Sequence, residues 1–107
     1  MNNYNWANAY NLCFNSGAEL VTIKSQSEND YVASLIPYTS QLRVWIGGSS
    51  RSVYGYTNWS NGEPNNLDNE EDKILMYGNY GNFEKGKWND ERRSTELDGI
   101  VCTYNKY

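Results

Sequence analysis

The acidic residues of this sequence are concentrated in one segment, and carboxylates gathered in this way can hold a cation. Between Asn61 and Glu91 there are eight acidic and three basic residues, so this segment carries a net charge of −5 while the whole chain carries −4. Carboxylate and amide oxygens from loops are the ligands that hard cations prefer. An acidic loop that is simply exposed to water has the same composition. The charge pattern therefore indicates a possible cation site and leaves the solvated loop as its alternative.

The scarcity of histidine and cysteine excludes several other kinds of site. The chain contains no histidine, which removes the commonest general base and the commonest transition-metal ligand. Its two cysteines, Cys13 and Cys102, are too few for a structural zinc site. Because they lie near opposite ends of a small polar chain, we expect one disulfide made in an oxidising compartment, with two free buried thiols as the alternative.

Length and composition predict a single domain over residues 1–107. Ten Tyr, four Trp and two Phe supply much of the 38% apolar content, so large rings must fill the core. The negative charge argues against nucleic acid and anionic membrane surfaces as partners, and no apolar run is long enough to span a membrane. Residues 1–5 do not resemble a signal peptide, and we expect a domain excised from a longer exported protein.

Two short helices are predicted in the first third of the chain. The first has apolar residues at helical spacing, with Asn5 as its cap and Gly17 as its end; these residues are Trp6, Ala9, Tyr10 and Cys13. A half-buried strand is expected over 18–23. The second helix begins with the capping box Ser25 to Glu28, and Pro37 stops it. Its predicted apolar stripe consists of Tyr31, Val32 and Leu35.

Strands and loops are expected to make up the remainder of the chain after the second helix. Short apolar runs occur at 44–48, 73–77 and 99–104, separated by Gly, Asn and Asp. The polar stretch 58–72 is predicted to be a long loop, and it lies within the acidic segment. Loops of this length in compact domains are usually functional or disordered.

Six short motifs stand out along the chain. They are Trp6-x-x-Ala9-x-x-x-Cys13, Gly17-Ala18-x-Leu20-Val21-x-Ile23, Trp45-Ile46-Gly47, Trp59-x-Asn61-Gly62-Glu63-Pro64-Asn65-Asn66, Trp88-Asn89-Asp90 and Val101-Cys102. In order and spacing they resemble the C-type lectin-like fold. The resemblance implies the fold class α+β, with two helices, two small antiparallel sheets and a long calcium-binding loop. It also implies a Cys13–Cys102 bridge between the first helix and the last strand.

The sequence departs from the family pattern in two places. Only Met1 to Asn5 remain for the strand that usually precedes the first helix, so this strand is truncated or very short. The family's second bridge, which braces the long loop, is expected at positions occupied by Lys73 and Arg93. We therefore expect the loop to depend more on bound metal for its order.

The resemblance implies a combined Ca²⁺ and sugar site. Its metal and ligand-binding residues are Glu63, Asn65, Glu71, Asn89 and Asp90. Acids would accept hydrogen bonds from sugar hydroxyls and amides would donate them. The order Glu63-Pro64-Asn65 is similar to the family's signature for mannose, glucose, N-acetylglucosamine or fucose, with a cis bond before Pro64. We expect Trp45, Trp59 and Trp88 in the core, and Glu70 and Asp72 to be surface acids rather than an auxiliary calcium site.

Two other binding functions are compatible with such a chain. Members of this family also bind proteins, and a calcium-dependent ice-binding protein uses a similar loop. An enzyme that uses paired acids is not expected, because the acids are already assigned to metal. The predicted partners are mannose-type glycans, in an extracellular, secreted or cell-surface setting. Because one such site binds a sugar weakly, we expect useful avidity to need several copies, in an oligomer or a multidomain protein.

Overall fold

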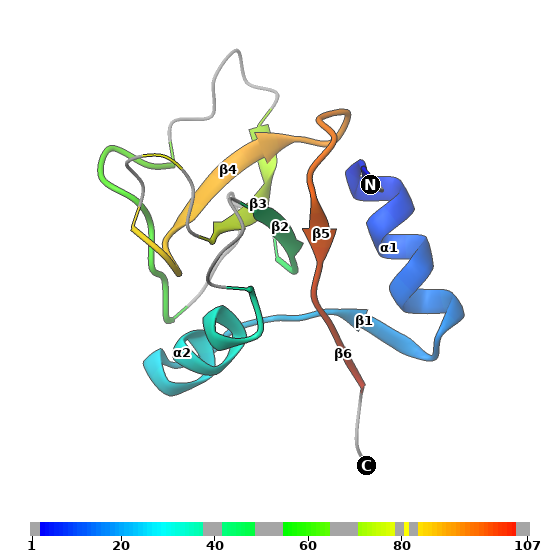
Figure 1. Ribbon diagram of the computed structural model, residues 1–107, viewed down its shortest axis with the longest axis horizontal. Helices are drawn as coiled ribbons and strands as arrows, with labels where there is room; N and C mark the ends of the chain where they lie inside the picture. Colours follow the sequence, from blue (N-terminus) through cyan, green and yellow to red (C-terminus); the bar gives the residue numbers. More distant parts are fainter. Residues whose placement is uncertain are drawn as a thin grey trace.

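The computed structural model describes residues 3–37, 42–48, 55–64, 71–78, 81 and 84–104. Two helices pack on two small sheets in this part of the chain, as the resemblance predicted (Figure 1). No helix among the described residues is long and apolar enough to cross a membrane.

Helix α1 (Trp6–Asn15) begins and ends where its sequence predicts. The Asn5 side chain accepts a hydrogen bond from the Asn8 backbone N–H (2.9 Å), and Gly17 follows the helix with φ +77°. Cys13 is fully buried, as expected. Tyr10 is 44% exposed and was wrongly placed on the inner face, because its ring stacks along the outside of the helix on Trp6 at 5.3 Å between ring centroids.

The two-stranded sheet joins the chain ends. Strand β1 (Ala18–Leu20), shorter than predicted, pairs antiparallel with β6 (Cys102–Tyr104). The predicted Cys13–Cys102 disulfide is present and ties α1 to β6. Before α1, Tyr4 forms one antiparallel bridge with Leu97, in which the two residues exchange backbone hydrogen bonds of 2.9 and 2.8 Å.

Helix α2 (Gln26–Ser34) has a cap close to the predicted capping box. The Ser25 hydroxyl accepts from the Glu28 N–H at 3.1 Å, while the Glu28 carboxylate accepts from the N–H of Lys24 rather than of Ser25. The Glu28 carboxylate thus accepts from a backbone N–H that lies one residue earlier than in a standard capping box.

The predicted apolar stripe of α2 is wrong for two of its three residues. Val32 is buried, but Tyr31 and Leu35 are 66% and 52% exposed. Asn29 is buried instead, because its amide donates to the Gly86 carbonyl (3.1 Å) and accepts from the Trp88 indole N–H (2.8 Å). These two hydrogen bonds orient Asn29, a polar residue of the helix, toward the sheet.

The larger sheet has the order β4-β3-β2-β5. Its strands are β2 (Arg43–Ile46), β3 (Glu71–Tyr77), β4 (Trp88–Arg92) and β5 (Gly99–Ile100). The β2–β3 and β3–β4 pairs are antiparallel, whereas β2 and β5 are parallel. This sheet is therefore mixed, not antiparallel throughout, since β5 enters beside β2 in the same direction before continuing into β6.

Aromatic rings occupy the core on both faces of this sheet. Trp45 (0% exposed) belongs to the cluster beneath α1, and Trp88 (2%) to the cluster beneath α2. Trp59 packs against the second cluster, with its ring edge-on to Trp88. The expected core placement is confirmed for Trp45 and Trp88, whereas Trp59 is partly buried at the margin of the core.

Candidate functional site

The segment from Asn58 to Pro64 begins beside the first residue of β4, on the outer edge of that strand. The Trp88 N–H donates to the Asn58 carbonyl at 2.9 Å, and the Ser60 N–H donates to the Trp88 carbonyl at 2.8 Å. These bonds form a parallel bridge between Trp59 and Trp88. The loop is thereby anchored one residue before Asn89.

A tight turn then presents Glu63. The Glu63 N–H donates to the Ser60 carbonyl at 3.0 Å, and Gly62 takes φ +85°, a conformation that glycine adopts without strain. The peptide bond between Glu63 and Pro64 is cis, which confirms the prediction. Glu63 is half-buried and Pro64 is exposed.

Asn89 and Asp90 are neighbours on β4, so their side chains point to opposite faces of the sheet. Asn89 lies opposite Leu75 on β3, and Asp90 lies opposite Ile74. Asp90 is fully buried. Because β4 is an edge strand, both side chains can reach a common ligand only around its outer edge, the edge on which the Asn58–Pro64 segment begins.

Of the two ends of the Asn89 amide, only one has a hydrogen-bond partner among the described residues. Its Nδ2 donates to the Tyr77 hydroxyl at 2.9 Å. Its Oδ1 is buried and accepts no hydrogen bond from the described part of the chain. A buried acceptor without a donor is costly unless water or an ion satisfies it.

Tyr77 is hydrogen-bonded to Asn89, and the charge of Glu63 acts on it. Burial raises the pKa of the Tyr77 phenol, the hydrogen bond from Asn89 lowers it, and the negative charge of Glu63 raises it further. The phenol thus contacts the predicted ligand Asn89 and is affected by the charge of the predicted ligand Glu63. The structure brings Glu63 and Asn89 to the same region, with Asp90 adjacent in the chain.

The side chains of two predicted ligands lie outside the described part of the structure. Asn65 lies outside the described residues. The backbone of Glu71 begins β3 opposite Arg92, but its side chain is not among the described ones. Within the described residues, no group of three or more His, Cys, Asp or Glu side chains is arranged to hold a metal ion.

The residues present nevertheless fit a hard cation. The Asn89 Oδ1, which has no partner among the described residues, would serve as a neutral oxygen ligand, and Asp90 on β4 and Glu63 on the adjoining loop would add side-chain carboxylates. Oxygen donors of this kind suit calcium. Coordination would satisfy the buried Asn89 oxygen.

Lys73 and Arg93, at the positions of the absent second bridge, converge on Trp6. The Lys73 ammonium lies 4.2 Å from the Trp6 ring centroid, and the Arg93 guanidinium carbon 5.5 Å from it. Arg93 also pairs with Asp72 at 3.0 Å. Burial, followed by the nearby Arg93 charge, lowers the pKa of Lys73, while Asp72 acts in the opposite direction. Asp72 is thus an ion-paired acid, while Glu70 lies outside the described residues.

Sequence reasoning missed Tyr77 and Asn29. Both bond to residues of β4 or its approach, namely Asn89 for Tyr77, and Trp88 with Gly86 for Asn29. Only strand register and helix docking create these contacts. The only indication in the sequence was that Tyr77 ends an apolar run. Such a run predicts a strand but does not predict which residue the tyrosine will contact.

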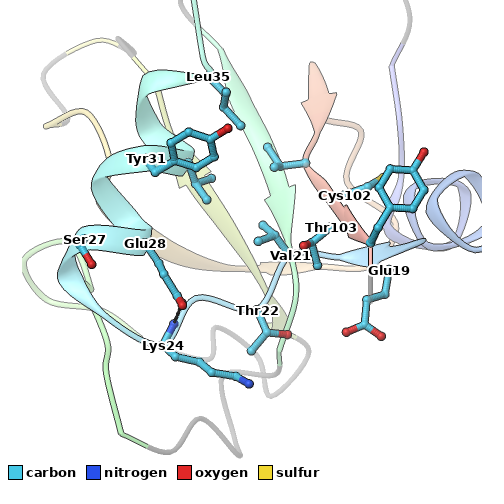
Figure 2. Close-up of a pocket in the computed structure, with 13 residues that line it drawn as sticks. Glu19, Val21, Thr22, Lys24, Ser27, Glu28, Tyr31, Leu35, Cys102 and Thr103 are labelled. Carbon is cyan, nitrogen blue, oxygen red and sulfur yellow. Dashed lines mark hydrogen bonds between the residues drawn. The ribbon is translucent and has the colours of Figure 1, made fainter. Parts of the chain in front are cut away.

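A cleft of about 510 Å³ lies elsewhere, between α2 and the β1–β6 sheet (Figure 2). Its exposed lining includes Tyr31, Leu35 and Tyr104. The hydrogen bond from Lys24 N–H to the Glu28 carboxylate crosses its lower end in Figure 2. None of the described predicted ligands lines this cleft.

Comparison with known proteins gives similarities over nearly the whole chain. A family profile described as Lectin C-type domain matches residues 2–104. The low affinity immunoglobulin epsilon Fc receptor of Mus musculus is 34% identical over 108 residues, which cover 91% of this chain and 30% of the receptor. E-selectin of Oryctolagus cuniculus is 33% identical over 111 residues, which cover 94% of this chain and 20% of the selectin. The chain therefore spans less than a third of either relative.

Two solved structures have a similar fold. The cow C-type carbohydrate-recognition domain of CD23, solved in the presence of a GlcNAc2Man3 oligosaccharide, has a TM-score of 0.77 and 30% identity, covering 94% of this chain and 79% of that one. The C-type lectin CEL-I from Cucumaria echinata has a TM-score of 0.81 and 25% identity, covering 97% and 86%.

Proposed function

The chain belongs to the C-type lectin domain family, and on this basis we propose that it binds carbohydrate through a calcium ion. The proposed ligands are the oxygen-bearing side chains at the β4 edge and on the adjoining loop: Glu63, Asn65, Glu71, Asn89 and Asp90. The named relatives are receptors and selectins, which agrees with the expectation that the chain is not an enzyme.

The observation that carries this proposal is the buried Oδ1 of Asn89, which has no hydrogen-bond partner among the described residues. A buried oxygen without a donor costs about 1–3 kcal/mol unless something else satisfies it. Glu63 is held nearby by the Ser60–Glu63 turn, and its charge acts on the phenol that Asn89 contacts. A calcium ion would satisfy the Asn89 oxygen and offset the repulsion among the acids.

Sugar recognition follows from the pairing of acids with amides. A sugar hydroxyl has one hydrogen to donate and two lone pairs, so it can bind a cation, donate to a carboxylate and accept from an amide at once. Glu63 and Glu71 would accept from the sugar, and Asn65 and Asn89 would donate to it. Two neighbouring hydroxyls bound in this way give both affinity and orientation.

The specificity that we propose is of the mannose type, including glucose, N-acetylglucosamine and fucose. The order acid, proline, amide at Glu63-Pro64-Asn65 sets which hydroxyl donates and which accepts. In support, the related cow CD23 domain is described in the presence of a mannose-containing oligosaccharide.

Isothermal titration tests the proposal directly. Methyl α-mannoside and methyl β-galactoside are titrated into the protein in excess Ca²⁺ and again in EDTA. We expect binding of the mannoside that disappears in EDTA, with much weaker binding of the galactoside. Mannoside binding that persists in EDTA would contradict a calcium-mediated site, and a preference for galactoside would contradict the proposed specificity.

A protein ligand is the second candidate function. The observation that favours it is the relative named as an immunoglobulin epsilon Fc receptor, a name that implies a protein partner for that receptor. Binding of Ca²⁺ without binding of either sugar would favour this function, or an ice surface, over the lectin.

We further propose an extracellular, secreted or cell-surface location. The Cys13–Cys102 disulfide is typical of oxidising compartments, and the relatives include a receptor and selectins. A shallow site for one sugar binds weakly, so several copies, in an oligomer or a multidomain protein, would be needed for high avidity.

A further inference from the structure

We propose that Tyr77 is a positioning residue that aims the Asn89 carbonyl oxygen at the cation. This inference rests on the proposed calcium site. It adds to that site a residue that bears no ligand atom of its own and that acts through the orientation of an amide.

Strand register brings the two side chains together. Leu75 pairs with Asn89 and Met76 with Trp88 across β3 and β4, so Tyr77 lies diagonally from Asn89 on the same face of the sheet. The Asn89 Nδ2 reaches the Tyr77 hydroxyl at 2.9 Å. This is a normal hydrogen-bond length.

The hydroxyl is a rigid reference point. Tyr77 is only 4% exposed, and its ring belongs to the core cluster that also contains Cys13, Trp45 and Leu75. A ring packed in this way cannot follow a moving partner. Asn89, which is only half-buried, is therefore held in place by Tyr77 and not the reverse.

An asparagine amide needs such a partner because its two ends have opposite character. Oδ1 is a cation ligand, whereas a flipped amide would present N–H groups to the cation and be repelled. In this structure Nδ2 donates to Tyr77, and Oδ1 is the end that has no partner in the described part of the chain. Nδ2 keeps a second hydrogen, which remains available for a sugar hydroxyl.

The substitution Tyr77→Phe removes the hydroxyl and keeps the ring in the core. We expect the Kd for Ca²⁺ alone, measured by titration calorimetry without sugar, to rise about three- to tenfold, as for the loss of one hydrogen bond. Tyr56→Phe is the matched control, since the Tyr56 hydroxyl donates to Gln26 at 2.7 Å, away from the predicted ligands. The control should retain the wild-type Kd.

A second measurement examines the hydrogen bond in calcium-free protein. By NMR in EDTA, the side-chain amide protons of Asn89 should exchange with solvent more slowly in the wild type than in Tyr77→Phe. Equal exchange, or a Kd for Ca²⁺ equal to that of the wild type, would overturn the role of Tyr77. If the wild-type protein itself bound no Ca²⁺, the proposed function would fail instead, so the two failures are distinguishable.

Discussion

The ammonium group of Lys73 lies 4.2 Å from the centroid of the Trp6 ring, and this contact joins β3 to the first turn of α1. Arg93 approaches the same ring from the end of β4, and its backbone carbonyl accepts a hydrogen bond from the Trp6 N–H at 3.0 Å. Two cations and one indole thus connect the segments that a second disulfide would brace.

Replacing Trp6 with leucine should weaken this connection. Trp6→Leu removes both cation contacts but keeps an apolar side chain, so we expect the free energy of unfolding to fall by about 1–2 kcal/mol, measured by urea denaturation. Tyr10→Leu is the control, because Tyr10 stacks on Trp6 but contacts neither cation in the described structure. Equal losses in the two variants would show that the cations contribute nothing.

Calcium should stabilise the fold strongly, since no second disulfide braces the loop. A ligand at one hundred times its Kd adds about 2.7 kcal/mol to the free energy of unfolding. For a domain of this size that corresponds to a rise in Tm of about 10 °C or more. Circular dichroism melts in Ca²⁺, in Mg²⁺ and in EDTA test this expectation. Melting temperatures that agree within error in Ca²⁺ and in EDTA would contradict it.

Asp90→Asn should weaken calcium binding with little change in shape. The substitution replaces a buried carboxylate with an amide of the same size, and we expect the Kd for Ca²⁺ to rise by about tenfold or more, roughly 1.4 kcal/mol. Asp98→Asn serves as the control, because the Asp98 carboxylate accepts from the Arg43 N–H at 3.0 Å and is not a predicted ligand. Wild-type calcium affinity in Asp90→Asn would exclude Asp90 from the site.

The cleft between α2 and the β1–β6 sheet should be dispensable for sugar binding. Tyr31→Ser and Leu35→Ser change two exposed residues of its lining and should leave the Kd for methyl α-mannoside unchanged. Glu63→Gln, at the proposed site, should weaken binding in the same titration. Loss of mannoside binding in the cleft variants, with retention in Glu63→Gln, would move the sugar site to the cleft.

Several features were predictable because their interactions are local in the sequence. The caps of α1 and α2 depend on residues three positions apart, Asn5 with Asn8 and Ser25 with Glu28. The order of motifs was sufficient for the family resemblance and therefore for the disulfide and the cis bond at Pro64. The five ligands remain a prediction, because Asn65 and the side chain of Glu71 lie outside the described residues.

Other features required the folded chain. Helical spacing predicted an apolar stripe on α2 but could not show which face of the helix would be buried. Asn29 is buried through its hydrogen bonds to Trp88 and Gly86, and Tyr31 and Leu35 are therefore exposed. Similarly, the absence of cysteine at positions 73 and 93 did not predict which contacts would connect these segments instead of a disulfide.

The sequence by itself determined the helix ends, the disulfide partners and the oxygen-rich residues available for a cation, since composition and local spacing are enough for each. Only the tertiary structure decided which polar atoms meet. The contact between Tyr77 and Asn89 depends on the register of β3 against β4, and a shift of one residue would send either side chain to the other face of the sheet.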